Sequence, residues 1–500
     1  MRSRRKRLGG SSYTDVAPPL LLELWRGAVW AQPGLGVLSR IAPRLMVTAG
    51  HSPMFCAIDF GTSNSAIAIP DTRPDLRPEA TTRMRLVELE PGHATMPTAV
   101  FYFVDDPRAL PERDGPPRAF GRAAVAAYVD GLDGRLMRSM KSILGSNLID
   151  QTTDVGGGRG AKYLDIVAGY LKHLKGRAEA AAGSPIHRAV LGRPVFFVDD
   201  DPVRDAQAQA ALEAAARQVG FDDIEFQYEP IAAAFDYERS TRGEQIVLVA
   251  DIGGGTSDFS VVRVGPMHAA KPDRKADILA NHGVHVAGTD FDRRVELAAI
   301  LPLYGFGAMG PSVAGAPARE VPSGVYFDLA TWHLINTVYS PGRVAELRSM
   351  RGFYGDPKHY ERLMVVVSER LGHELTARAE QAKIDVADGG RTRIDLGHTE
   401  RHLAAALTEQ QAVEAVSADI ERIVGAAREA VTQAGLAPAQ VDALYFTGGS
   451  TGLRLLAERI AAAFPAAQPV RGDRFASVAT GLGLHAQRRF GNQSGLGGVA

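Results

Sequence analysis

An acidic residue followed by a glycine–threonine turn occurs twice in this chain. The copies are Asp59-Phe-Gly-Thr-Ser-Asn64 and Asp251-Ile-Gly-Gly-Gly-Thr256. Glycine permits positive φ angles and close backbone approach, so successive N–H groups of such a turn can donate to phosphate oxygens, and hydroxyl groups add donors. A carboxylate beside a phosphate needs a cation between them, and Mg²⁺ suits this set of oxygen ligands. Each copy therefore predicts half of a Mg²⁺ and phosphate site; the alternative is two unrelated glycine hairpins.

Apolar runs on both sides of each turn predict the elements that hold it in place. Residues 55–69 and 246–262 each read strand, turn, strand, with apolar residues on both strand faces as in buried central strands. Alternation predicts a third strand over residues 83–90 and a continuation near 98–104. Helices are predicted at 119–129, 135–144, 163–182, 205–219 and 407–434, with a strand at 189–197.

Two further stretches could complete such a site. Pro230 suits the first turn of a helix and places Glu229 at its entrance, where a carboxylate could orient an attacking water. The alternative for Glu229 is a helix start favoured by the macrodipole. Residues 443–452 read strand, then the glycine turn at Gly448 and Gly449, then helix, and a nucleoside could lie against that backbone. The P-loop glycine pattern is missing from the sequence.

Composition is that of a large nucleotide enzyme rather than a nucleic-acid or membrane protein. At 500 residues the chain exceeds the size of a single core, so at least two lobes are expected. The net charge of −1, with scattered basic residues, argues against a nucleic-acid partner. No apolar run reaches the roughly 18 residues of a membrane span. The single cysteine, Cys56, lies in the first strand and excludes an internal disulfide, which suits a reducing cytoplasm.

The first 53 residues do not share this pattern. They begin with a basic cluster, and Glu23 and Arg26 interrupt the short apolar run before it reaches the length of a signal-peptide core. We expect residues 1–53 to form a disordered N-terminal extension and the functional chain to begin at Met54. Residues 491–500 are rich in glycine and predict a flexible tail.

These stretches, taken in order, resemble the actin-like ATPase superfamily and, within it, the DnaK-type heat-shock 70 kDa chaperones. The two aspartate turns are similar to the family's two phosphate motifs, Glu229-Pro-Ile-Ala-Ala-Ala to its connecting motif, and Gly448-Gly-Ser-Thr to its adenosine motif. Three stretches resemble chaperones rather than actins: residues 138–145, 287–292 and 378–383. The resemblance runs from residue 54 to about residue 490. It is closest to the short YegD-like type, which consists of the ATPase portion alone.

The resemblance implies an α/β fold of the duplicated actin-like and ribonuclease-H-like kind, with two lobes around a nucleotide cleft. Lobe I would span residues 54–240 and be completed by residues 472–490. Lobe II would span residues 241–471 and contain an enlarged insertion at 291–378.

The resemblance also implies roles for individual residues. Lys141 matches the lysine near the γ-phosphate, and Lys141, Glu229, Asp251 and Thr256 match the residues implied to be catalytic. Asp59 and Asp251 match the carboxylates that hold Mg²⁺ through water. The residues that match the ATP-binding set are Gly61, Thr62, Ser63, Gly253, Gly254, Gly255, Gly288, Glu380, Lys383, Gly448, Gly449 and Ser450.

Two departures from the family pattern affect the expected ligand and partner. Family members commonly hold adenine between two arginines, but Ile384 and Gly452 occupy those positions here, so cation–π stacking is lost. The long insertion enlarges the cleft rim, so a standard exchange factor is not expected to dock. Because only a glycine-rich stretch follows the last predicted helix, we expect no β-rich peptide-binding domain.

We therefore expect a monomeric, cytoplasmic, chaperone-like protein that binds ATP and Mg²⁺, hydrolyses ATP weakly and acts on a protein client or co-chaperone through lobe closure. One alternative is a polymerising bacterial actin-like ATPase, against which Lys141 and the insertion argue. Another is a small-molecule kinase of the same superfamily, for which no catalytic aspartate facing an acceptor pocket is evident. His282 and His285 lack the neighbours of a metal site and predict none.

Overall fold

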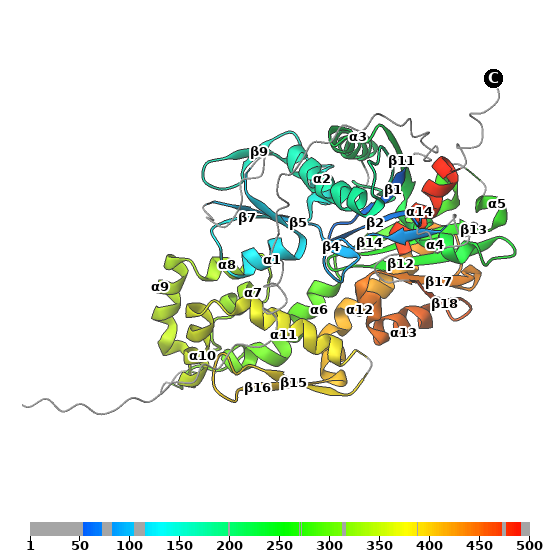
Figure 1. Cartoon of the computed structure of the whole chain (residues 1–500). Coiled ribbons are helices and arrows are strands. Elements are labelled where there is room, and N and C mark those ends of the chain that lie inside the picture. Colours follow the sequence, from blue (N-terminus) through cyan, green and yellow to red (C-terminus); the bar gives the residue numbers. More distant parts are fainter. Residues whose placement is uncertain are drawn as a thin grey trace, which may run out of the picture. The chain divides into compact units, whose positions relative to one another are not determined.

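The computed structural model describes most of the chain between Met54 and Gly491 (Figure 1). The described residues are 54–72, 83–104, 116–198, 201–269, 271, 273–312, 317–387, 389–472 and 477–491. The predicted extension over residues 1–53 and nearly all of the predicted tail lie outside the described residues. Among the helices that are described, none is both long enough and apolar enough to cross a bilayer.

The first central sheet has the strand order β11-β10-β1-β2-β3, and β4 also pairs with β2. β1 and β2 form an antiparallel hairpin with Ala57 opposite Ala68, whereas β1, β10 and β11 run parallel. The hairpin carries the first aspartate turn at its tip. The strands are β1 (Phe55–Phe60), β2 (Asn64–Pro70), β3 (Met84–Leu86), β4 (Thr95–Pro97), β10 (Arg188–Arg193) and β11 (Asp223–Tyr228).

The second central sheet repeats this plan, with the order β14-β13-β12-β17-β18. β12 and β13 form the antiparallel hairpin that carries the second aspartate turn, and β12, β17 and β18 run parallel. Strand order and strand directions thus agree between the two sheets, which confirms the predicted duplicated α/β fold. The strands are β12 (Gln245–Ile252), β13 (Ser257–Val264), β14 (Ile278–Val284), β17 (Ala443–Thr447) and β18 (Gln468–Arg471).

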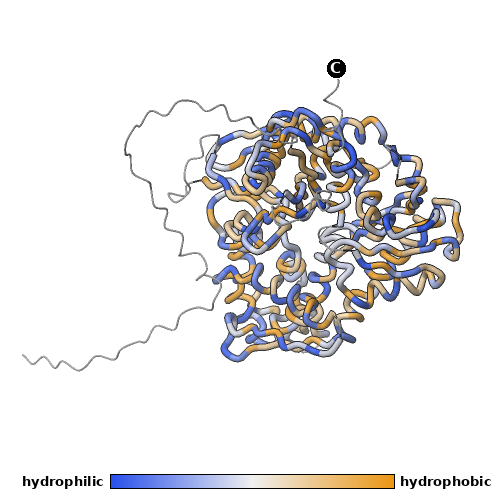
Figure 2. The backbone as a smooth tube through the Cα atoms, turned by 45° about the vertical axis from the view of Figure 1, so that its right-hand side comes forward, coloured by the Kyte–Doolittle hydropathy of each residue, from blue (hydrophilic) through white to orange (hydrophobic). Residues whose placement is uncertain are grey.

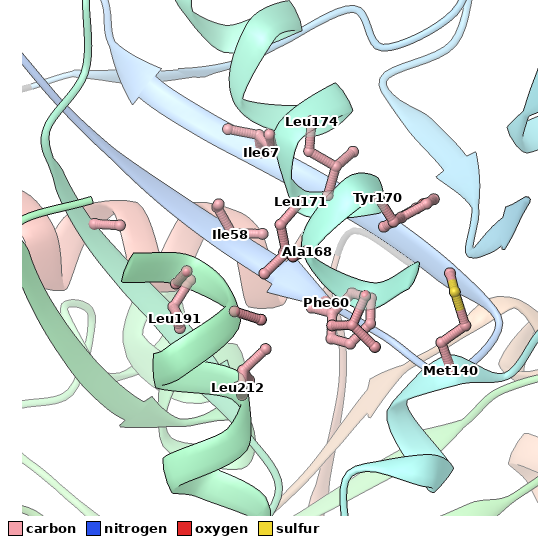
Figure 3. Close-up of a cluster of buried hydrophobic side chains, with 14 of the residues drawn as sticks. Ile58, Phe60, Ile67, Met140, Ala168, Tyr170, Leu171, Leu174, Leu191 and Leu212 are labelled. Atoms are coloured by element: carbon pink, nitrogen blue, oxygen red, sulfur yellow. The ribbon is translucent and has the colours of Figure 1, made fainter. Parts of the chain in front are cut away.

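Helices α2 (Tyr163–Ala182) and α3 (Pro202–Gln218) cover one face of the first sheet. Because strand side chains alternate between faces, β1 turns Ile58 and Phe60 toward these helices and Ala57 toward the opposite face. Figure 3 shows Leu171 of α2 beside Ile58 and Leu212 of α3 near Leu191 in this core. Hydrophobic and hydrophilic stretches alternate along much of the chain (Figure 2), as expected for elements that bury one face.

The second sheet is covered in the same way by α12 (Glu409–Gln433) and α13 (Arg454–Ala463). Thr408 and Gln411 form a capping box that starts α12, in which each side chain accepts from the backbone N–H of the other residue. Ile420 and Ile423 of this predicted helix are both fully buried against the sheet. Each sheet therefore has its own helical layer on its outer face.

Two helices, α4 (Glu229–Glu238) and α14 (Ser477–Phe490), pack between the two sheets. α4 leads from β11 to β12, and α14 packs on β1, β2 and β10. Their alanines and glycines allow the backbones to touch: a Cβ on Gly481 would lie 1.9 Å from the carbonyl oxygen of Ala232. The buried cluster around this crossing takes residues from both sheets, among them Val190 and Val249. The helix crossing is thus the joint between the two halves.

A smaller sheet overturns one prediction for the first half. Residues 135–144 were predicted as a helix but form strand β7 (Gly134–Arg138) and a 3₁₀ turn (Met140–Ile143). Leu136 pairs with Phe101 of β5, and long-range pairing of this kind overrides helix propensity. This region comprises β5 (Ala99–Phe103), β6 (Arg118–Phe120), α1 (Gly121–Val129), β8 (Thr152–Asp154) and β9 (Gly160–Lys162).

The long stretch from α6 to α11 is helical and has its own core. Tyr304, Tyr326, Leu363 and Leu375 are buried together there. The hairpin of β15 (Arg391–Asp395) and β16 (Ala404–Thr408) packs beside it. The helices are α6 (Gly288–Val295), α7 (Gly324–Leu329), α8 (Ile335–Val338), α9 (Pro341–Ser349), α10 (Pro357–Ser368) and α11 (Gly372–Asp385); the short α5 (Pro266–Ala269) follows β13.

Trp332 links this helical insertion to the first half of the fold. Its ring stacks on Tyr128 of α1 at a centroid distance of 4.9 Å, and the guanidinium of Arg138 lies 4.3 Å from its centroid. His373 meets both aromatic rings edge-on. Tyr128, Arg138, Trp332 and His373 are called the Trp332 clasp below; in Figure 1, α1 and α8 lie side by side near it.

Replacing Gly481 by alanine is expected to lower the thermal unfolding midpoint. The added Cβ would clash with the backbone of Ala232, and overpacking of this kind costs about 1–3 kcal/mol. Gly176→Ala in α2 is the matched control, because its added Cβ would meet nothing within 4 Å. The control should gain up to about 1 kcal/mol. Equal midpoints for the two variants in scanning calorimetry would contradict a backbone contact between α4 and α14.

Candidate functional site

The residues predicted to form a site all line one cleft with a volume of about 800 Å³. They come from the tips of the two duplicated hairpins, the start of α4 and α6, the last turns of α11 and the turn after β17. They are Asp59, Gly61, Thr62, Ser63, Lys141, Glu229, Asp251, Gly253, Gly254, Gly255, Thr256, Gly288, Glu380, Lys383, Gly448, Gly449 and Ser450.

Carboxylates dominate the middle of this cleft. Asp59 and Asp251 lie at equivalent places near the ends of β1 and β12, and Glu229 begins α4. Lys141, from the 3₁₀ turn after β7, donates to Glu229 with 2.5 Å between Nζ and Oε1. Asp258 was not among the predicted site residues, although it lies opposite Asp251 in the β12–β13 pair. The four-residue turn between those strands fixes this pairing, so the sequence did contain the signal.

The pKa values of three of these carboxyl groups are raised, because Lys141 does not offset their burial and mutual repulsion. Burial, Glu229 and Asp251 together raise the pKa of Asp59 to about 8, against the opposing effect of Lys141. Burial, Asp258 and Glu229 raise the pKa of Asp251 to about 7. Burial also raises the pKa of Asp258. The cleft therefore favours either protons or an additional cation beside these groups.

This donor set fits Mg²⁺ held through water. Oxygen ligands are those that Mg²⁺ prefers, and Mg²⁺ commonly keeps several waters while using one or two carboxylates. In the part of the chain that the structure describes, no three His, Cys, Asp or Glu side chains gather closely enough to enclose an ion directly. Asp59 and Asp251 are the residues that could hold such an ion through its waters.

The two glycine turns are rigid and face each other. Thr98 holds the first turn, because its Oγ1 donates to the carbonyl oxygen of Gly61 over 2.7 Å. The second turn is closed by the N–H of Gly253, which donates to Thr256 O over 3.0 Å. A Cβ on Gly254 would come within 3.3 Å of Ser63 Oγ, so the turns approach closely and leave little room for side chains.

Three segments of the cleft lining meet beside the second turn, at the end formed by α6, α11 and the turn after β17. Ser450 Oγ donates to Gly253 O over 2.7 Å, and the N–H of Gly288 donates to the same oxygen over 3.2 Å. Gly448 has a φ of +84°, and a Cβ there would lie 2.4 Å from Ile252 O. These glycines therefore allow backbone to pack on backbone beside the second turn.

Lys383 at this end is paired with Asp292, a residue that was not predicted. Lys383 Nζ and Asp292 Oδ1 are 2.6 Å apart. Burial raises the pKa of Asp292 to about 6, against the lowering effect of Lys383. Glu380, one turn earlier on α11, is exposed. Asp292 lies four residues after Gly288 on α6, and its partner is distant in sequence, so no local pattern marks the pair.

The family comparison covers part of this site. A family model described as Hsp70 protein matches residues 151–298, which include Glu229, the second aspartate turn and Gly288. A chaperone protein DnaK of Thermosipho melanesiensis is 32% identical over 242 residues. That match covers 48% of this chain and 34% of the relative. The alignment thus spans about a third of the length of that relative.

Asp59→Asn is expected to stabilise the nucleotide-free protein more at pH 8 than at pH 5. Since folding raises the pKa of Asp59 from 3.8 to about 8, the folded state favours its protonated form. The stability that this group contributes at low pH is lost as pH rises from about 4 to about 8. Thermal unfolding midpoints at the two pH values measure the effect.

Asp150→Asn is the control for this measurement, because Asp150 is exposed on the surface. Its midpoint should follow that of the native protein at both pH values. A midpoint difference for Asp59→Asn that does not change between pH 5 and pH 8 would show that the carboxylate cluster is not strained.

Proposed function

We propose that this chain is a chaperone-type ATPase of the DnaK-type Hsp70 family, to which residues 151–298 are similar, and that it binds ATP with Mg²⁺ in this cleft. The observation that carries the proposal is the meeting of two equivalent aspartate turns, from equivalent hairpins, around a buried carboxylate cluster. The raised pKa values of Asp59 and Asp251 support a cation there. The facing glycine turns supply backbone donors for phosphate oxygens.

Individual side chains then have distinct tasks in phosphoryl transfer to water. Mg²⁺, when bound, neutralises charge on the phosphate oxygens. Lys141 places a cation beside the γ-phosphate, where negative charge is redistributed in the transition state. Glu229 orients the attacking water, and its bond to Lys141 fixes both side chains. Thr256 offers a hydroxyl donor at the end of the second turn.

The joint between the halves is suited to couple nucleotide to movement. Phosphate contacts from both turns draw the two sheets together, and the tight crossing of α4 and α14 confines the motion to rotation at one place. The Trp332 clasp connects the helical insertion to α1 and β7 of the first half of the fold. We propose that lobe closure is the output which a protein partner would sense.

Lys141→Ala is expected to lower the single-turnover rate of ATP hydrolysis by about 100- to 1000-fold, since that is the usual cost of removing one charge-stabilising donor. Asp251→Ala is expected to abolish the Mg²⁺-dependent part of ATP binding in titration calorimetry. Lys162→Ala is the control, because Lys162 is exposed and is not among the residues lining the cleft.

Two results would contradict the assignment. One is the absence of any binding heat when ATP and Mg²⁺ are titrated into the native protein. The other is an unchanged affinity for Mg²⁺–ATP in the Asp251→Ala variant.

Trp332→Ala is expected to speed release of a fluorescent ADP analogue by roughly ten- to thirtyfold in stopped-flow measurements. A stacked aromatic pair and a cation–π contact each contribute about 1 kcal/mol, and both are lost. Trp332→Phe keeps an aromatic ring and should show a smaller effect. Phe353→Ala, an exposed residue of the same insertion, is the control. Release as slow in Trp332→Ala as in the control would mean that the clasp does not restrain the cleft.

A further inference from the structure

The end of the cleft formed by α11 and the turn after β17 is lined by aliphatic side chains. Ile384, in the last turn of α11, is 54% exposed and lines the cleft together with Ala387. Gly452 and Leu453, after the turn that follows β17, line the same cleft. Ala387 and Leu453 also border a small adjoining pocket of about 10 Å³, so the two segments meet there. The other apolar residues of that pocket are Val295, Val386, Ala412, Val413, Val416 and Leu455.

Two basic side chains near this end already form ion pairs with carboxylates. Lys383 is paired with Asp292 at 2.6 Å, and Arg454 bonds to both Glu409 and Glu458. Among the described residues that line the cleft there is no arginine. A planar base at this end would therefore lie on aliphatic surface, without a free guanidinium to stack on it.

The hydroxyl groups of two nearby side chains already donate to backbone oxygens. Ser450 Oγ donates to Gly253 O and Thr451 Oγ1 donates to Gly448 O. Glu380 is an exposed carboxylate that can only accept hydrogen bonds. Adenine and guanine both carry N–H donors, so an acceptor of this kind does not by itself separate them.

We propose that this site accepts nucleoside triphosphates with little discrimination between bases; this inference rests on the proposed function. Affinity comes from the phosphate end, and the base lies on the aliphatic surface of Ile384 and Leu453. An apolar surface cannot strongly reject a ligand that differs only in polar groups, whereas strong selection needs buried partners for those groups. The hydroxyl groups of Ser450 and Thr451 are bonded to backbone oxygens, so they are not available to select a pattern of donors and acceptors on the base.

The test is titration calorimetry of ATP, GTP, CTP and UTP, each with Mg²⁺, into the native protein. The four dissociation constants are expected to agree within about tenfold. Ile384→Arg should tighten ATP and GTP binding by roughly three- to thirtyfold, because it adds a guanidinium that can stack on a purine. Gln381→Arg adds the same charge at an exposed position that does not line the cleft, and it should leave all four constants unchanged.

The outcomes separate this inference from the proposed function. ATP binding more than about a hundredfold tighter than GTP binding would overturn base tolerance and leave the ATPase proposal standing. An Ile384→Arg variant that binds purine nucleotides like Gln381→Arg would show that the base does not lie on Ile384. Failure of all four nucleotides to bind the native protein would overturn the proposed function, and the inference with it.

Discussion

Four carboxylates share the middle of the cleft with the ammonium group of Lys141, and the scaffold has to hold them there against their mutual repulsion. Asp59, Asp251 and Asp258 are fixed on strands, so none can move away without breaking a sheet. Glu229 is held by the start of α4 and by its bond to Lys141. The strain appears as raised pKa values and is relieved by any divalent cation that the cleft accepts.

Duplication is what makes this arrangement possible. Each half supplies the same hairpin, with the aspartate at the same strand end, and the outer face of each sheet has a layer of helices. Small residues at the crossing of α4 and α14 let the inner faces share one buried cluster. The two turns can then face each other at short range while each remains part of a rigid sheet.

Local patterns in the sequence predicted the hairpins, because Asp59 and Asp251 follow apolar runs whose structure depends on neighbours in sequence. The helix predicted at 135–144 was wrong because the structure there does not depend on neighbours in sequence. Leu136 is in a strand because it pairs with Phe101, which is distant in sequence. Lys141 could be placed only through family resemblance, since nothing around it marks a buried cation. The partners of Trp332 and Lys383 are likewise set by tertiary packing and have no local signal.

The central claim is that the two aspartate turns form one site for Mg²⁺ and a nucleoside triphosphate. A crystal structure with Mg²⁺ and a non-hydrolysable ATP analogue tests it most directly. We expect the phosphates between the turns at Gly61–Ser63 and Gly253–Thr256, with the ion linked to Asp59 and Asp251 through water. A nucleotide bound elsewhere, or a triphosphate in the cleft that touches only one of the two turns, would contradict the account.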